Sequence, residues 1–389
     1  MSGPLKPETT AVRAGLETDT AHGAVVPPLY LTSTFTFEGP GQKRQYDYSR
    51  SGNPTRDVLA EALAQLEGGA GCVVTGTGMS AVHLATTLVR PGERIVAPHD
   101  CYGGTYRLLS ALHRTGRAEV EFIDMADARQ RASALAGGAR LVWIETPSNP
   151  LLRITDLATV AAEARAAGAV VAADNTFMTP LGQSPITLGA DLVIHSTTKY
   201  INGHSDVLGG AVISRDEAMH QELAWWANCY GLTGGTFDAF MTMRGLRSLH
   251  VRWRQHQSNA LAVARLLAGH PAVKRVFYPG LEADPGHGLA STQQQGYGAM
   301  VSVELAGGSA AVAAFLAGTA CFSLAESLGG VESLVAHPDT MTHAAMEEGA
   351  RRAAGITPGL LRFSIGIEAE DDLLADLGTA LDRASKATS

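Results

Sequence analysis

The chain has 389 residues, of which 45% are hydrophobic and 17% charged, and its formal net charge is −8. This composition excludes a disordered protein, and the length exceeds what a single core usually organises, so we expect two domains. The acidic balance without a Lys/Arg run argues against nucleic-acid binding, and the lack of a stretch of roughly 18 apolar residues argues against a membrane span.

The first predicted unit is an N-terminal arm over residues 1–57. This segment is rich in Pro, Gly, Thr and Tyr and shows no sustained helical period, which is typical of extended chain. Residues 1–17 lack the apolar core of a signal peptide, so we expect a cytoplasmic protein.

The second unit, residues 58–245, alternates short apolar runs with helical stretches. Such alternation predicts a mostly parallel sheet covered on both faces, the mark of an α/β domain. A helix is expected first, at 57–67. The strands are expected at 72–75, 94–98, 120–123, 141–145, 169–173, 192–195 and 211–214. Helices between them are expected at 79–89, 106–114, 126–135 and 154–167.

The third unit, residues 246–389, has a different texture and predicts a smaller α+β domain. A long helix is expected at 246–268, followed by strands and short helices in mixed order. The strands are expected at 273–278, 300–304 and 361–365, and the helices at 310–316 and 371–384.

Four cysteines are scattered along the chain, at Cys72, Cys101, Cys229 and Cys321. None of them forms a CxxC pair or another spacing used for metal ligands, and the histidines are equally scattered. The sequence therefore predicts free thiols in a reducing compartment and no metal site.

A lysine with hydroxyl neighbours follows the strand predicted at 192–195. The segment 191–205 reads Asp-Leu-Val-Ile-His-Ser-Thr-Thr-Lys-Tyr-Ile-Asn-Gly-His-Ser and places Ser196 and Thr198 beside Lys199. A partly desolvated lysine amine forms an imine with a carbonyl cofactor, and neighbouring hydroxyls donate to a phosphate. A solvated lysine at a strand end is the alternative, since Ser-x-x-Lys alone has little specificity.

An apolar strand that ends in an acid precedes this lysine. Residues 169–176 read Ala-Val-Val-Ala-Ala-Asp-Asn-Thr, with Asp174 at the strand end. In enzymes that use pyridoxal phosphate (PLP), an aspartate so placed pairs with the protonated pyridine nitrogen and keeps the ring an electron sink. A helix N-cap is the other interpretation of Asp174.

A glycine-rich turn after the first strand adds a place for a phosphate. Residues 73–81 pass from a strand through Gly76 and Gly78 to a helix start, where backbone N–H groups bind anions. The pattern Gly-x-Gly-x-x-Ala with Asp100 downstream also imitates a dinucleotide fingerprint, so a nicotinamide-dependent oxidoreductase is a rival hypothesis. That hypothesis leaves the lysine and aspartate segments unexplained, as does a non-catalytic binding protein.

With these residues in view, the chain resembles the PLP-dependent enzymes of Cys/Met metabolism, the γ-family of fold type I with the aspartate aminotransferase architecture. The resemblance extends over nearly the whole chain and implies that fold, with PLP as the cofactor. Its segments are 26–28, 47–55, 66–69, 97–104, 145–151, 191–205, 326–330 and 361–368.

The resemblance implies a role for each residue around the cofactor. Lys199 would bind PLP covalently and move protons, Asp174 would bind the pyridine nitrogen, and Tyr102 would stack on the ring and help deprotonate the incoming amine. The phosphate would be held by Gly78, Met79, Ser196 and Thr198, and by Tyr48 and Arg50 from a neighbouring subunit.

The resemblance also implies residues for the amino-acid substrates. Arg362 would bind the α-carboxylate, assisted by Asn149 and the Ser327 backbone. Asp47 and Glu326 would receive the amino group of a second substrate, and Arg107 a distal carboxylate. Ser51 departs from the pattern, because some family members carry a second arginine after the equivalent of Arg50, and this leaves open whether position 51 contacts a substrate carboxylate.

The implied reaction is γ-replacement. Cysteine thiol would displace the acyloxy group of an O-acylated homoserine, expected to be the succinyl ester, to give cystathionine and succinate. γ-Elimination from cystathionine stays open as an alternative, as do the less favoured sulfhydrylase and methionine γ-lyase activities, because these enzymes share nearly all of the same residues. A homo-oligomer is expected, a tetramer built from two dimers.

Overall fold

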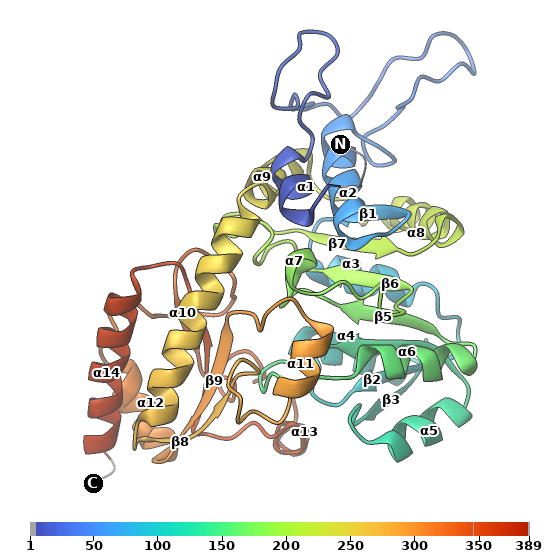
Figure 1. Cartoon of the computed structure of the whole chain (residues 1–389). Helices are drawn as coiled ribbons and strands as arrows, with labels where there is room; N and C mark the ends of the chain where they lie inside the picture. Colours follow the sequence, from blue (N-terminus) through green and yellow to red (C-terminus); the bar gives the residue numbers. More distant parts are fainter. Residues whose placement is uncertain (1–4, 345, 388–389) are drawn as a thin grey trace.

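The computed structural model describes residues 5–344 and 346–387 and contains two separate β-sheets (Figure 1). The larger sheet has seven strands in the order β1-β7-β6-β5-β4-β2-β3. Its strands are β1 (Gly71–Thr75), β2 (Arg94–Pro98), β3 (Glu119–Ile123), β4 (Ala139–Glu145), β5 (Val170–Asp174), β6 (Leu192–His195) and β7 (Gly210–Ser214).

The run from β3 to β6 is parallel, and β7 lies antiparallel between β6 and β1. This arrangement confirms the mostly parallel sheet expected from the sequence. It also brings the carboxyl ends of β4, β5 and β6 to one edge, which is where ligands bind in open α/β sheets.

Helices cover both faces of the large sheet because its strands are apolar on both sides. In β4, Trp143 packs toward the cluster that contains α3, α4 and α8, while Val142 and Ile144 pack toward α5 and α6. The helices of this region are α2 (Pro54–Glu67), α3 (Gly78–Thr86), α4 (Gly103–Arg114), α5 (Ala128–Ala136), α6 (Leu157–Ala166), α7 (Thr179–Gly182) and α8 (Glu217–Tyr230).

The smaller sheet has five strands in the order β10-β11-β12-β9-β8 and is antiparallel except between β10 and β11. Figure 1 shows α10 running from the large-sheet region down beside β9, with α12 and α14 on the same side. The strands are β8 (Val273–Phe277), β9 (Met300–Leu305), β10 (Ser323–Leu324), β11 (Leu334–Ala336) and β12 (Leu360–Ser364). The helices are α9 (Thr236–Leu246), α10 (Leu249–Gly269), α11 (His287–Gln293), α12 (Gly308–Leu316), α13 (Glu348–Ala354) and α14 (Glu370–Lys386). We propose that the two sheets are the cores of the domains expected at 58–245 and 246–389.

The N-terminal segment contains one element that the sequence did not predict, the short helix α1 (Pro7–Arg13). Seven residues are too few to show a helical period, yet Pro7 starts the helix and Thr10 and Ala11 are buried against α2. Between α1 and α2 the chain forms only turns and isolated bridges such as Thr34 with Tyr48, and its loops project away from the helices in Figure 1.

In the described ranges, no helix is both long and apolar enough to cross a membrane.

Candidate active site

A cavity of about 370 Å³ lies where the carboxyl ends of β4, β5 and β6 face the small-sheet region. Eleven of the residues named from the sequence line it. They come from strands, helices and loops of both the large-sheet and the small-sheet regions. They are Gly78, Met79, Tyr102, Asn149, Asp174, Ser196, Thr198, Lys199, Glu326, Ser327 and Arg362.

Lys199 stands in the turn after β6, and its amine points at the loop between β10 and β11. Its Nζ donates a hydrogen bond to Ser327 Oγ at 2.7 Å. Burial and, to a smaller extent, the positive charge of Arg362 together lower the pKa of Lys199 to about 8. A useful share of the amine is therefore neutral near physiological pH, as a nucleophile or base at a carbonyl cofactor requires.

Asp174 ends β5 and presents a carboxyl group to the same cavity. Its Oδ1 accepts the Thr176 N–H at 3.0 Å, which fixes the carboxyl group at the strand end. Burial raises the pKa of Asp174, while the hydrogen bonds from Thr176 and the charge of His195 oppose that rise. A partly buried acid of this kind pairs well with a protonated ring nitrogen, because that cation compensates the loss of water around its charge.

The third part of the cavity is the amino end of α3. Thr77 caps this helix by accepting the Ser80 N–H at 3.0 Å. The first N–H groups of a helix have no partner within the helix, so the others at this end can bind an anion. Gly78 is required here, since an added Cβ would lie 2.7 Å from Cβ of Ser196. Backbone N–H groups at this end and the hydroxyls of Ser196 and Thr198 together suit a phosphate.

The residues present therefore fit PLP. A lysine with a depressed pKa, a partly buried acid and a helix N-terminus with hydroxyls line separate parts of one cavity. These are the partners that an aldehyde, a pyridine nitrogen and a phosphate need.

Arg362 brings a buried cation from β12, where its side chain is only 3% exposed. Its Nη1 donates to Asn149 Oδ1 and its Nη2 to Ser327 O, each at 3.0 Å. Its Nε has no hydrogen-bond partner among the described residues, and burial lowers the pKa of Arg362 to about 10. A guanidinium so buried, with a donor still open, suits a carboxylate.

Tyr102 stands directly before α4 with its side chain 41% exposed. Its backbone N–H donates to Glu145 Oε2 at 2.8 Å. Burial raises the pKa of Tyr102, and the positive charges of Arg107 and Arg362 oppose that rise. The ring lies against the helix start, because a Cβ at Gly104 would meet Tyr102 Cε1 at 2.5 Å.

Four residues named from the sequence do not line this cavity in their own chain. Arg50 donates from Nε to Asn228 Oδ1 at 2.9 Å and lies 5.5 Å from the ring centre of Tyr48. Asp47 accepts from the Ser51 hydroxyl at 2.8 Å, and Arg107 is exposed on α4. Their roles stay predictions.

The cavity also contains residues to which the sequence analysis gave no role. The most informative is Glu145, which ends β4 and is aligned with Asp174 on β5. The signal was available, because an acid at the end of a predicted strand beside another such acid is unusual for a core position. The others are Thr77, Val82, Pro147, Thr176, Phe177, Ile194, Leu208, Leu328 and Thr342.

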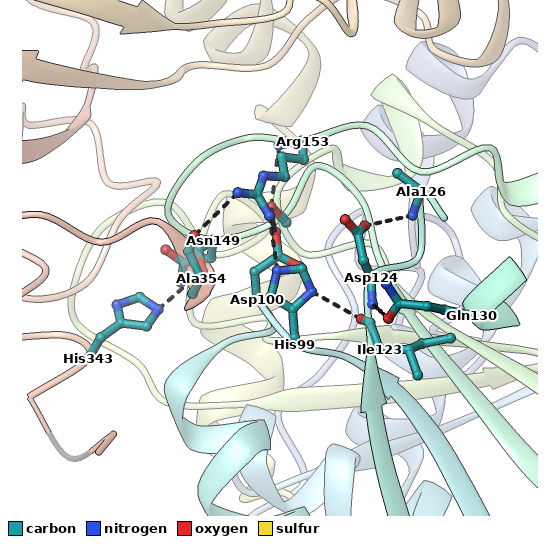
Figure 2. Close-up of polar contacts among 11 residues, drawn as sticks. His99, Asp100, Ile123, Asp124, Ala126, Gln130, Asn149, Arg153, His343 and Ala354 are labelled. Atoms are coloured by element: carbon teal, nitrogen blue, oxygen red, sulfur yellow. Dashed lines mark hydrogen bonds and ion pairs between the residues drawn. The ribbon is translucent and has the colours of Figure 1, made fainter. Parts of the chain in front are cut away.

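Figure 2 shows the polar contacts beside Asn149 at the margin of this site. His343 Nε2 bonds to Asn149 O at 3.1 Å, and Arg153 lies between His99 and Asp100. Asp100, the acid of the rival dinucleotide pattern, therefore belongs to a network of protein groups, with Ser148 Oγ as a further donor at 2.8 Å.

Comparisons with known proteins agree with this geometry. The chain is 53% identical to cystathionine gamma-synthase of Escherichia coli (strain K12), over 98% of this chain and 99% of that one. A crystal structure of cystathionine gamma synthase from Xanthomonas oryzae pv. oryzae in complex with cystathionine matches with a TM-score of 0.98 and 59% identity, over 99% of this chain and all of that one. A cystathionine gamma-lyase from Lactobacillus plantarum, complexed with L-serine, matches with a TM-score of 0.95 and 37% identity, over 98% and 100% of the two chains.

The family model for Cys/Met metabolism PLP-dependent enzymes matches residues 8–382. This range includes Lys199, Asp174 and Arg362, the three groups around which the cavity is built. The chain belongs to the family of Cys/Met-metabolism PLP-dependent enzymes.

Proposed function

We propose that this enzyme catalyses PLP-dependent γ-replacement, in which O-succinyl-L-homoserine and L-cysteine give L-cystathionine and succinate. The observation that carries the proposal is the convergence of Lys199, Asp174 and Arg362 on one cavity, in a chain 53% identical to a cystathionine gamma-synthase along its length. Bound PLP supplies an electron sink for the electrons released at the substrate Cα.

Arg362 binds the α-carboxylate of the homoserine ester. Asn149 and the Ser327 carbonyl already hold two of its nitrogens, so the guanidinium is oriented before the substrate arrives. Arg362 and Lys199 both contact Ser327, so a carboxylate bound to the guanidinium lies close to the Lys199 amine.

Lys199 moves the protons. Its lowered pKa lets the amine accept a proton from Cα, pass that proton on within the site so that it is neutral again, and then accept one from Cβ. The same amine returns protons to these carbons later. Succinate leaves Cγ with the electron pair of the C–O bond, and the cysteine sulfur forms the new bond to Cγ. The thiol proton balances the carboxylate that is released.

The second substrate and the assembly involve residues beyond the cavity centre. Glu326 lies in the cavity and, with Asp47, receives the ammonium group of cysteine, while Arg107 receives a distal carboxylate. Tyr48 and Arg50 reach the phosphate of a neighbouring subunit in a dimer, and two dimers form a tetramer. The free thiols of all four cysteines support a cytoplasmic location.

One assay tests the reaction. Purified enzyme with PLP is mixed with O-succinylhomoserine and cysteine, and separately with cystathionine alone. Rapid formation of cystathionine with little 2-oxobutyrate is expected. Fast release of 2-oxobutyrate and cysteine from cystathionine would instead establish γ-elimination as the activity.

A further inference from the structure

Glu145 is a buried acid at the centre of the site for which the proposed mechanism has no use. It is the last residue of β4 and is 6% exposed. Its neighbour across the parallel strands is Asp174, and both side chains line the cavity.

The Glu145 carboxyl group joins two segments that are distant in the sequence. Its Oε2 accepts the backbone N–H of Tyr102 at 2.8 Å. A hydrogen bond from the backbone N–H of Asn149 is among the interactions that lower the pKa of this carboxyl group. One side chain is thus the shared acceptor for the start of α4 and for the loop that follows β4.

The first of these segments needs an anchor. Tyr102 directly precedes α4, and no described side chain caps the helix at this position. The residue is 41% exposed, so the contact of its ring with the start of α4 leaves much of the side chain unpacked. The bond to Glu145 therefore fixes the backbone from which the ring projects.

The second segment holds the carboxylate-binding arginine. Asn149 accepts from Arg362 through Oδ1 and from His343 through its backbone oxygen, as Figure 2 shows for His343. Displacement of Asn149 would release Nη1 of Arg362, which is buried and has lost its water.

An acid at this position is costly to keep. Burial and the nearby charge of Asp174 raise the pKa of Glu145 well above its usual value. An apolar side chain would avoid the cost of burying a carboxyl group but would leave the Tyr102 and Asn149 N–H groups without an acceptor.

We infer that Glu145 is a positioning residue of this active site, whose carboxyl group holds the ring of Tyr102 and, through Asn149, the guanidinium of Arg362 at a fixed separation. It thereby sets how the cofactor ring and the substrate α-carboxylate lie relative to each other. This inference rests on the proposed function for the identity of the substrate.

The test compares the PLP-loaded wild type with Glu145→Ala and Glu145→Gln. For Glu145→Ala, kcat/KM with O-succinylhomoserine should fall on the order of 100-fold, mainly through KM, as a displacement of about 1 Å in binding groups produces. Glu145→Gln keeps an acceptor for Tyr102 and loses one of the two bonds, so its KM should rise only about fivefold. The visible circular dichroism of bound PLP can be measured without turnover. It should change more in Glu145→Ala than in Glu145→Gln.

Asp191 offers a matched control. It is also a buried acid of the large-sheet region and accepts a backbone N–H, that of Val171, at 2.8 Å, but it precedes β6 at the opposite edge of the sheet. Asp191→Asn should lower the thermal stability and leave both KM and the dichroism of bound PLP unchanged.

A wild-type KM and spectrum in Glu145→Ala would overturn the inference, and so would equal losses in Asp191→Asn. If Glu145→Ala does not fold, Glu145→Gln decides the test. A KM of Glu145→Gln equal to that of the wild type within error would then overturn the inference. If the wild type forms no cystathionine, the proposed function fails while the dichroism comparison still tests Glu145. Normal wild-type synthesis with unaltered Glu145 variants defeats this inference alone.

Discussion

The cavity at the strand ends and the N-terminal arm carry the two halves of the expected site, and they differ in what holds their side chains. Lys199 and Arg362 are largely buried and bonded to Ser327 of the same chain. Tyr48 is 48% exposed, and Arg50 bonds to Asn228 away from the cavity. One chain is thus enough to position the first group, whereas the second lies outside the cavity of its own chain.

The dominant influence on charge also differs between the two regions. In the cavity, burial is the main cause that lowers the pKa values of Lys199 and Arg362. In the arm, the pKa of Asp47 is lowered mainly because the Ser51 hydroxyl donates to it. Desolvation therefore tunes reactivity in the cavity, while the arm carries exposed groups available for contact with another chain.

The largest effect is expected from the residue at the centre of the cavity. Lys199→Ala removes both the covalent attachment of PLP and the base, so turnover should fall by at least on the order of 10⁴-fold, with loss of the visible absorbance band of the lysine-bound cofactor. Lys274→Ala, which removes an exposed surface lysine paired with Glu304, is the control and should leave both unchanged. Retained turnover in Lys199→Ala would disprove the central assignment.

The next effect concerns the shape of the buried cation. Arg362→Lys keeps a positive charge but loses the planar fork that bonds Asn149 and Ser327, so KM for O-succinylhomoserine should rise about 100-fold. Arg131→Lys breaks a comparable two-nitrogen contact with Glu163 at a distance from the cavity and should not alter KM. Equal KM values in the two variants would remove Arg362 from substrate binding.

A smaller effect should appear in the stability of the PLP-free protein. The folded pKa of Lys199, about 8, is below the unfolded value of 10.5, so between these pH values the unfolded state binds more protons and stability rises with pH. From pH 8 to 10 the gain from this residue should be about 2 kcal/mol. Urea unfolding of wild type and Lys199→Met over this range measures it, and parallel curves for the two proteins would contradict it.

The smallest measured change, a partial recovery of activity, tests the arm. If Arg50 serves the neighbouring site, Arg50→Ala and Lys199→Ala should each be nearly inactive, yet a hybrid dimer of the two has one intact site. Random mixing of equal amounts should restore about a quarter of the wild-type activity. Recovery is measured after co-refolding, and its absence in verified hybrids would mean that Arg50 acts within its own chain.

Elements with continuous apolar runs could be predicted from the sequence to the residue. The strands β2 and β6 have the expected bounds because each is a short run of mainly apolar residues, with Arg94 at the start of β2 and His195 at the end of β6. The helix α8 was not predicted, since only Leu223 and Ala227 of its residues are buried and no apolar stripe results. The two-residue strand β10 is exposed and gave no pattern at all.

The same distinction applies to the site. Asp174 was predictable because it ends an apolar strand, and Lys199 because it lies in the turn that follows one. The parallel topology directs both to one edge of the sheet. Glu145 also ends a strand, but its importance depends on Tyr102 and Asn149, and no spacing in the sequence reveals those hydrogen bonds. Neither does the sequence show that Arg107 is exposed and outside the cavity lining.

Ser327 touches both functional cations, with its hydroxyl on Lys199 and its carbonyl on Arg362. Because the charge of Arg362 lowers the pKa of Lys199, a carboxylate bound to the guanidinium would offset that charge and raise the basicity of the amine. By thermodynamic reciprocity, protonation of the free amine would then tighten carboxylate binding by the same factor. Ser327 thus contacts both members of this pair, in which carboxylate binding at Arg362 changes the pKa of Lys199.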